Sequence, residues 1–321
     1  MRYIDVPETD LRPSALIIGA VCAVEGDPGD SFRLLDIFRD AGGNMIDSAN
    51  IYGKFFPAGT NVCDQNIGKW LKLKGCRNSF IVTTKGGHPP VDKLDKPDLG
   101  KKDVQTHLDE SLTALDTECI DLYYLHRDNV NIPAGEIIEY LNEFTDSGKI
   151  RYFGCSNWRP ERIEEAQAYA GKHGLRGFVA DQLLWNMGKV SMEKFPYPGC
   201  TNMDDKAYAY HLRTGMPAIA YESQARGLFQ KMHKRENLPK SLTELYGSDE
   251  NPGRLTRALS LCEQLGQPLS AVVLAYLTSQ PFPTAALIGP RDETQLLDSL
   301  NAADLVLTPE QLNYIDKKHN P

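Results

Sequence analysis

The chain alternates short apolar runs with longer amphipathic stretches, and this alternation limits the folds open to it. The runs have the length and residue types of β-strands, and the stretches between them show a helical period. Strands separated by helices pair in parallel, because a parallel pair needs a crossover connection. We predict strands at residues 16–20, 44–47, 80–85, 121–126, 150–156, 177–182, 218–223 and 285–289, and helices at residues 31–41, 103–115, 134–147, 159–173, 203–214 and 256–266.

Eight is the number of parallel strands that closes into a (β/α)8 barrel, the TIM-barrel fold. The competing architecture is an open, doubly wound sheet, which binds a dinucleotide through G-x-G-x-x-G after its first strand. Here the first predicted strand runs into Gly19-Ala20-Val21-Cys22, which lacks that pattern. No linker, internal repeat or low-complexity segment indicates a second domain. We therefore predict a single α/β domain, a (β/α)8 barrel over residues 1–321.

Two predicted connections are longer than a barrel requires, residues 185–204 and residues 224 to about 253. They follow the sixth and seventh predicted strands. Both would therefore lie on the C-terminal face of the barrel, where barrel enzymes carry their active sites. Long loops in a compact domain are usually functional lids or disordered segments.

Composition and charge argue against several classes of protein. A formal charge of −8 does not suit nucleic acid, which binds basic surfaces. No apolar stretch is long enough to span a bilayer, and the N-terminus lacks the apolar core of a secretion signal. The seven cysteines show neither a C-x-x-C pair nor metal-ligand spacing. We expect a cytoplasmic monomer or small homo-oligomer with reduced thiols and no metal.

Four polar side chains stand at or just beyond the ends of predicted strands. Asp47 ends the run Asn44-Met45-Ile46-Asp47, and Tyr52 follows it by one short turn. Lys85 and His126 end the third and fourth predicted strands. Because the C-terminal ends of barrel strands meet at one face, we expect the four at a single barrel mouth. A phenol, an ammonium, a carboxylate and an imidazole form a proton-donating site for a carbonyl.

The chemistry of such a site depends on the phenol, because tyrosine titrates near pH 10 and is a poor acid at neutral pH. An ammonium about 4 Å from the phenol oxygen favours the phenolate by roughly 4 kcal/mol at an effective dielectric near 20. That corresponds to about three pK units, so we expect Lys85 to acidify Tyr52. Asp47 would keep Lys85 charged. His126 would aim the substrate oxygen, most usefully as a neutral imidazole.

Each of these residues taken alone has a simpler explanation. A tyrosine one turn after a strand is often a packing group, and a lone lysine or histidine at a strand end is more often solvated or a cap. Four such residues on three consecutive strand ends of one barrel are harder to explain in this way. We therefore interpret them as a catalytic set.

The chain resembles the aldo-keto reductase superfamily over nearly its whole length. Residues 44–53, Asn-Met-Ile-Asp-Ser-Ala-Asn-Ile-Tyr-Gly, are similar to the family's Asp-through-Tyr signature. Thr83-Thr84-Lys85 and Leu125-His126-Arg127 match the segments that carry its lysine and histidine. The resemblance implies NAD(P)H-dependent reduction of an aldehyde, ketone or sugar carbonyl to an alcohol, or the reverse. It also implies Tyr52 as general acid, supported by Asp47, Lys85 and His126.

The resemblance further implies a cofactor site along the later strands. A serine–asparagine pair can hold a carboxamide, which both donates and accepts hydrogen bonds, although both residues are also common helix caps. Trp185 falls where the family usually stacks an aromatic ring on the nicotinamide. Segment 221–228 is similar to the loop that closes over the pyrophosphate, and segment 288–295 to the adenosine site. The implied cofactor residues are Ser156, Asn157, Gln182, Trp185, Tyr221, Ser223, Ala225, Gly227, Gly289, Arg291 and Gln295.

The cofactor expected from Arg291 is NADP, with NAD as the alternative, because Asp292 and Glu293 add negative charge beside it. Some branches of the family also have a lysine where this chain has Gly289. Two rival functions stay open. One is a nicotinamide-nucleotide-binding redox sensor with little turnover. The other is a barrel hydrolase or lyase that uses His126 and Asp47, which ranks low because it needs a metal or a nucleophile that the sequence does not offer.

Overall fold

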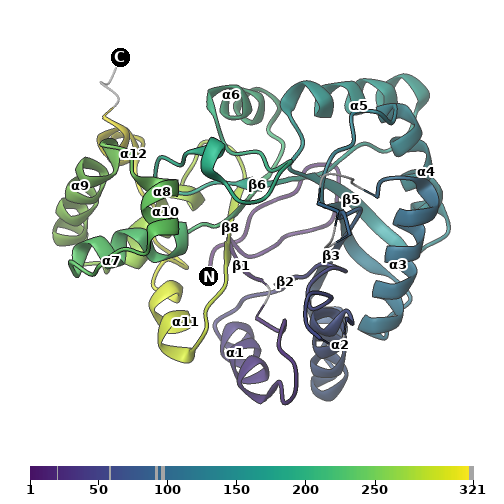
Figure 1. The fold of residues 1–321 in the computed structure, drawn as a ribbon, viewed down its shortest axis with the longest axis horizontal. Coiled ribbons are helices and arrows are strands. Elements are labelled where there is room, and N and C mark those ends of the chain that lie inside the picture. The colour runs from purple at the N-terminus through teal and green to yellow at the C-terminus, as the bar shows by residue number, and fades with distance from the viewer. Residues whose placement is uncertain (20, 58, 91–92, 95–97, 318–321) are drawn as a thin grey trace.

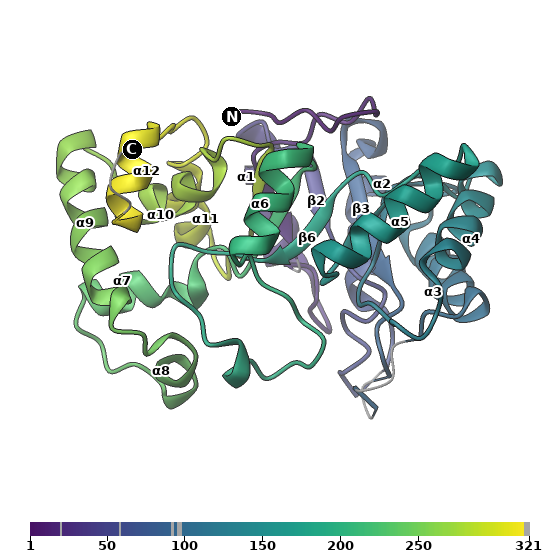
Figure 2. The same ribbon diagram turned by 90° about the horizontal axis from the view of Figure 1, so that it is seen from above.

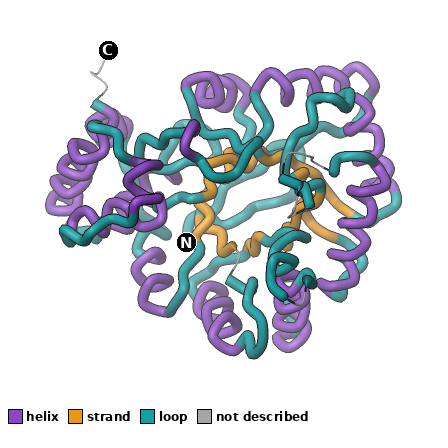
Figure 3. The backbone as a smooth tube through the Cα atoms, viewed as in Figure 1, coloured by secondary structure: helices purple, strands orange, loops and turns teal. Residues whose placement is uncertain are grey.

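The computed structural model of the chain describes residues 1–19, 21–57, 59–90, 93–94 and 98–317. Within these residues, the parallel strands close into one barrel in sequence order, with β8 pairing back onto β1. Figure 3 shows the ring of strands at the centre of the molecule. The strands are β1 (Leu16–Gly19), β2 (Met45–Asp47), β3 (Ile81–Gly86), β4 (Ile120–Leu125), β5 (Ile150–Ser156), β6 (Asp181–Leu184), β7 (Ala218–Tyr221) and β8 (Thr284–Ile288). The predicted (β/α)8 fold is confirmed.

Helices surround the strands and cover the outside of the barrel (Figure 1). Short 3-10 turns, η1 (Arg77–Ser79), η2 (Met192–Lys194) and η3 (Ala225–Gly227), lie in the connections. The helices are α1 (Gly29–Asp40), α2 (Val62–Lys74), α3 (Lys101–Leu115), α4 (Ala134–Asp146), α5 (Pro160–His173), α6 (Asp205–Thr214), α7 (Leu228–His233), α8 (Lys240–Tyr246), α9 (Glu250–Leu265), α10 (Leu269–Thr278), α11 (Glu293–Leu300) and α12 (Pro309–Asp316).

Local sequence signals set several of these boundaries. The side chain of Asn61 caps α2 by accepting a hydrogen bond from the Asp64 N–H, and Gly75 ends the helix in the left-handed region at φ 59°. Thr308 and Gln311 form a reciprocal capping box at the start of α12. These caps use polar groups that the ends of a helix would otherwise leave unpaired.

The sixth strand begins later than predicted. Its predicted start at residue 177 is wrong, because β6 starts at Asp181. The side chain of Gln167 takes both backbone groups of Phe178, accepting from its N–H at 2.8 Å and donating to its carbonyl at 3.0 Å. Those groups are therefore not available to the strand ladder. Ala20, the predicted last residue of the first strand, lies outside the described residues.

The two long connections lie on one face of the barrel. Figure 2 shows the connection after β6, together with α8, on the side opposite the N-terminal segment. The connection after β7 contains α7 and α8 rather than an unstructured loop. Inside the barrel, Ile17, Met45, Leu122 and Ile219 belong to one buried cluster. The barrel is therefore filled by side chains, and a site must form at its open end.

Candidate active site

Lys85 and Asp47 form a buried ion pair at the C-terminal ends of β3 and β2. The Lys85 Nζ donates to Asp47 Oδ2 at 2.5 Å and to the Ser48 carbonyl at 2.6 Å. The two side chains are 0% and 3% exposed. Burial lowers the pKa of Lys85, but Asp47 and Tyr52 raise it by more, so the pKa lies above its ordinary value. Lys85 is therefore held as an ammonium, as predicted.

Tyr52 lies against this ammonium, whose nitrogen is 5.0 Å from the centre of the phenol ring. Burial of the hydroxyl raises the pKa of Tyr52, and the charge of Lys85, which lowers it, does not offset that effect. The predicted net acidification of Tyr52 is therefore wrong. The ammonium does attract a phenolate, but the free-energy cost of burying that phenolate is larger and was left out of the prediction.

His126 completes the group of four and also contacts Tyr52. The two rings meet edge to face with their centroids 5.8 Å apart. Burial first, and then the positive charge of Arg127, hold the pKa of His126 well below its ordinary value. The imidazole is therefore neutral at pH 7, as expected. Its buried Nδ1 has no hydrogen-bond partner among the residues that the structure describes.

Gln182 connects the ion pair to the fifth and sixth strands. Its amide donates to Asp47 Oδ1 at 3.0 Å, and the Thr83 hydroxyl donates to the same oxygen at 2.9 Å. Ser156, the last residue of β5, is the register partner of Gln182 and is 1% exposed. Gln182 thus contacts the Asp47–Lys85 pair, and Ser156 lies beside Gln182 on the neighbouring strand.

Asn157, the third implied carboxamide ligand, already uses every hydrogen-bonding site of its side chain within the protein. Its Nδ2 donates to the His126 carbonyl at 3.2 Å and to Ser156 Oγ at 3.0 Å. Its Oδ1 accepts from Tyr221 at 2.7 Å and from the Thr201 N–H at 3.2 Å. A primary amide has two donors and two acceptor sites, so this amide is saturated. In this arrangement Asn157 ties together the ends of β4, β5 and β7.

Trp185 points away from the barrel mouth. Its ring stacks on Phe282 at 5.9 Å and meets Tyr208 of α6 edge to face, and it is 6% exposed. Side chains alternate along a strand, and Asp181 points outward to His211 of α6. Trp185 follows the outward direction of Asp181 rather than the inward direction of Gln182. The predicted stacking of Trp185 on a nicotinamide does not fit this placement, which is that of a packing residue.

The end of β7 leads into a tight left-handed turn. Ser223 donates a hydrogen bond to the Leu287 carbonyl at 2.5 Å and so fixes the turn to β8. Ala225, Arg226 and Gly227 have φ values of 49°, 56° and 76°. A Cβ at Gly227 would lie 2.9 Å from the ammonium of Lys231, so the backbone and a positive charge are close together here. Successive amides in such turns form anion-binding concavities.

The N-terminus of α11 carries both signs of charge. The Arg291 side chain is exposed, and the backbone N–H of Arg291 donates to Gln295 Oε1. Asp292 caps the helix by accepting from the Gln295 N–H at 2.9 Å. Glu293 is paired at 2.6 Å with Arg33 of α1, a second guanidinium that sequence reasoning missed because it is distant in the chain. Gly289, just before this helix, is exposed.

His88 is a further residue at the site that the sequence patterns did not mark. It follows β3, and its ring lies 4.8 Å from that of His126. Burial lowers the pKa of His88 to about 4, with Arg127 acting in the same direction. The signal that could have found it is its position three residues after Lys85, on the same strand end.

In the described part of the chain, no His, Cys, Asp and Glu side chains gather in threes as a metal site requires. Nor does any described helix combine the length and apolar character needed to cross a bilayer.

Comparison with known proteins assigns the chain to a family. The sequence model described as "Aldo/keto reductase family" matches residues 16–320. "Uncharacterized oxidoreductase YrpG" of Bacillus subtilis (strain 168) is 30% identical over 323 residues, covering 98% of this chain and 95% of the relative. The chain belongs to the aldo/keto reductase family, and it is an oxidoreductase with the fold predicted for it.

Other relatives have more specific names. An "Aryl-alcohol dehydrogenase [NADP(+)]" of Phanerodontia chrysosporium is 27% identical over 310 residues, covering 90% of this chain and 76% of the relative. A "Probable voltage-gated potassium channel subunit beta" of Oryza sativa subsp. japonica is 27% identical over 337 residues, covering 98% and 96%. The dehydrogenase name, together with the family, supports the oxidoreduction of carbonyls and alcohols.

Proposed function

We propose that the protein reduces a small-molecule carbonyl to an alcohol, or runs the reverse reaction, with Tyr52 as general acid and base. The observation that carries the proposal is the contact of Tyr52 with both the charged Lys85 and the neutral His126. A nicotinamide cofactor, when bound, supplies the hydride. The two electrons of the hydride form the new C–H bond, and the proton from Tyr52 forms the new O–H bond.

The raised pKa of Tyr52 is consistent with this role in the direction of reduction. A phenol that stays protonated can donate its hydrogen to the carbonyl oxygen throughout the neutral pH range. The oxygen becomes a stronger base as the hydride arrives, so the proton moves only in the transition state. Lys85 then stabilises the phenolate that remains, until water returns a proton to it. His126, neutral and buried, would hold the same substrate oxygen.

The residues around the barrel mouth fit a nicotinamide nucleotide in part. Ser156 and Gln182 would hold the carboxamide, since the amide of Asn157 is saturated and would act by fixing the strand ends. The ring of Tyr221 is the aromatic candidate beside them. The left-handed turn that contains Ser223, Ala225 and Gly227, with the Lys231 ammonium beside it, would hold the pyrophosphate. Gly289, Arg291 and Gln295 would hold the adenosine end.

We propose NADP as the cofactor, with NAD as the alternative. Two guanidiniums, Arg291 and Arg33, lie at the start of α11, where a 2′-phosphate would meet the N-terminus of the helix. The name of the NADP(+)-using relative supports the same choice. The negative charges of Asp292 and Glu293 disfavour a 2′-phosphate at this place, although Glu293 is paired with Arg33. A cytoplasmic location stays a prediction.

A second candidate function is a nucleotide-binding redox sensor with little turnover. The relative named as a probable potassium channel subunit, which covers 98% of this chain, supports only the broader point that a protein of this length and fold can be named for a role other than turnover. The contact between Tyr52 and Lys85 argues for turnover instead, since a sensor needs the cofactor site but not a proton donor.

The test is to replace Tyr52 with phenylalanine, which removes only the hydroxyl. We expect turnover of aldehydes with NADPH to fall by about 10²–10⁴-fold. The dissociation constant of NADPH, followed by fluorescence titration, should stay within about threefold. Tyr314→Phe on α12, where the side chain is exposed, is the matched control and should keep full turnover. Full activity of Tyr52→Phe would discard the proposal, and wild-type protein that binds NADPH but turns over no aldehyde would favour the sensor.

A further inference from the structure

Arg127, the residue after His126, is a buried cation that pairs with no carboxylate among the residues that the structure describes. It is 7% exposed, and its Nη1 donates to the His126 carbonyl at 2.8 Å. Asp128, the next residue, pairs instead with Arg162 of α5 at 3.4 Å. A guanidinium stays charged in a protein, so Arg127 cannot escape burial by losing a proton. An unpaired buried charge lowers the stability of a fold, which points to another use for it.

Neighbouring segments hold Arg127 in this position. The Trp158 indole N–H donates to the Arg127 carbonyl at 3.1 Å. The long connection after β6 covers the side chain, because a Cβ at Gly199 would lie 3.6 Å from Arg127 Cδ. Asn157 Nδ2 donates to the His126 carbonyl at 3.2 Å, alongside the guanidinium. That carbonyl therefore receives two donors, and the backbone that carries the imidazole is fixed.

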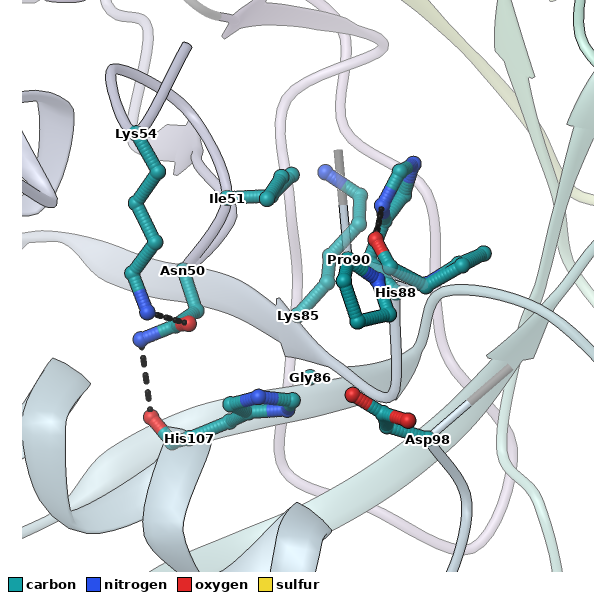
Figure 4. A pocket seen from close by; sticks show the side chains of 10 residues that line it. Asn50, Ile51, Lys54, Lys85, Gly86, His88, Pro90, Asp98 and His107 are labelled. Atoms are coloured by element: carbon teal, nitrogen blue, oxygen red, sulfur yellow. Dashed lines mark hydrogen bonds between the residues drawn. The ribbon is translucent and has the colours of Figure 1, made fainter. Parts of the chain in front are cut away.

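Of the charged groups that act on His126, Arg127 is the one without a counter-charge in the described part of the chain. Lys85 forms its ion pair with Asp47. His88 contacts the His126 ring, but burial lowers the pKa of His88 to about 4, so it is neutral at pH 7. Lys85 and His88 come from the end of β3 and the connection after it, and both line the pocket drawn in Figure 4. Burial is the main cause of the low pKa of His126, and the charge of Arg127 is the next.

The same charge acts on Tyr52. Burial raises the pKa of Tyr52, and the nearby Asp47 and Cys63 add to the rise. The charges of Lys85 and, more weakly, Arg127 act in the opposite direction. A positive charge stabilises the phenolate that remains after Tyr52 gives up its proton. It also favours the negative charge that develops on a carbonyl oxygen as the hydride arrives.

We propose that Arg127 is a positioning residue for the reaction. Its hydrogen bond fixes the backbone of His126, and its charge supports the negative charge that forms on the substrate oxygen and on Tyr52. Arg127 acts through these two side chains rather than by touching the reacting atoms. An arginine suits this role because its planar guanidinium donates to a carbonyl and remains charged when buried. The proposal rests on the proposed function, since it assigns a role within the same reaction.

The test separates the charge of Arg127 from its hydrogen bond. Arg127→Met removes both, Arg127→Gln keeps a donor without the charge, and Arg127→Lys keeps the charge. With benzaldehyde and NADPH, we expect kcat to fall by about tenfold in the Met and Gln variants, with the KM for benzaldehyde within about threefold. Arg127→Lys should keep kcat within about threefold of wild type, because the charge remains. The matched control is Arg12→Met before β1, where the side chain is 71% exposed, and it should keep full kcat.

A titration that needs no turnover completes the test. A nearby positive charge disfavours the imidazolium, so removing it should raise the pKa of His126. In nitrogen NMR, the His126 imidazole, assigned with the His126→Asn variant, should take up its proton at higher pH in Arg127→Met and Arg127→Gln than in wild type, by about one unit. Arg127→Lys should restore the wild-type titration. A purely structural role of Arg127 would not order the variants by charge.

Three results would overturn the proposal. They are an unchanged His126 titration in the variants without the charge, a kcat that Arg127→Gln keeps as well as Arg127→Lys, and a loss of kcat in Arg127→Lys as large as in Arg127→Gln. If Arg127→Met does not fold, the Gln and Lys variants carry the same comparison. If the wild-type protein reduces no aldehyde while the His126 titration shifts as expected, the proposed function fails and the effect of Arg127 on His126 stands.

Discussion

The buried pair of Asp47 and Lys85 gives the sharpest prediction about what holds the candidate site together. At an effective dielectric near 20, unit charges 2.5 Å apart attract each other by about 7 kcal/mol. Burying the two charges opposes most of that gain. Removing one partner leaves the other charge buried and unpaired, so we expect Asp47→Asn and Lys85→Met each to lower the free energy of unfolding by about 3–5 kcal/mol.

The double variant Asp47→Asn/Lys85→Met separates the pair from its surroundings. Asp47 also accepts from Thr83 and Gln182, so part of the Asp47→Asn effect belongs to those hydrogen bonds. The double variant leaves no unpaired charge, and we expect it to lose less than the two single variants together, with a coupling of about 1.5–3 kcal/mol. Urea unfolding at pH 7 gives these values, provided that the m-values agree among the four proteins.

The control for this cycle is Glu161→Gln, which breaks the Lys206–Glu161 pair on the surface. The Lys206 and Glu161 side chains are 76% and 62% exposed, so we expect no measurable change in the free energy of unfolding. Single variants of the buried pair that cost less than about 1 kcal/mol would refute the reasoning. So would additive effects with a coupling below about 0.5 kcal/mol, because the two charges would then not depend on each other.

Three further predictions follow from other contacts. Because the pKa of His88 is lowered to about 4, the unfolded chain takes up a proton near pH 6.5 that the folded protein does not take up until about pH 4. The free energy of unfolding should therefore fall by up to about 3 kcal/mol as the pH is lowered from 6.5 to 4. His88→Phe should flatten this part of the pH profile measured by urea unfolding, and an unchanged slope would contradict the prediction. Arg291→Ala should raise the KM for NADPH about tenfold and leave that for NADH within twofold, whereas equal changes for both would argue against a 2′-phosphate contact. Trp185→Ala should lower the free energy of unfolding, measured in urea, by about 3–5 kcal/mol. The dissociation constant of NADPH should stay within threefold. A selective loss of NADPH binding would restore the predicted cofactor role of Trp185.

The barrel could be predicted because strands buried on both faces remain visible as short apolar runs. β4 is buried at each of its six residues, and its run is clear in the sequence. α10 could not be found by its period, because every residue from Leu269 to Thr278 is buried and no polar face marks the turns. α2 was hidden for the opposite reason. Its buried face includes Asp64 and Asn66, which bond to Thr84 and to the Cys22 carbonyl.

The candidate site was predictable where chemistry follows from position at a strand end. Asp47 and Lys85 lie toward the C-terminal ends of the neighbouring strands β2 and β3, and Ser156 of β5 pairs with Gln182 of β6; parallel strands bring such positions to one face of the barrel. Properties that depend on three-dimensional surroundings were not predictable. The saturated amide of Asn157 depends on partners from four separate segments. The net pKa of Tyr52 depends on how deeply its hydroxyl is buried.

A pocket of about 230 Å³ beside Lys85 and the candidate cofactor residues come from different parts of the barrel. The pocket is built from the end of β3, the connections after β2 and β3, and α3, whereas the residues assigned to the nucleotide lie on or after β5 to β8. The connections that form the pocket can therefore change without changing the segments that carry the candidate cofactor residues. Exchanging the connections after β2 and β3 should therefore alter the pocket beside Lys85 and leave the candidate cofactor residues in place.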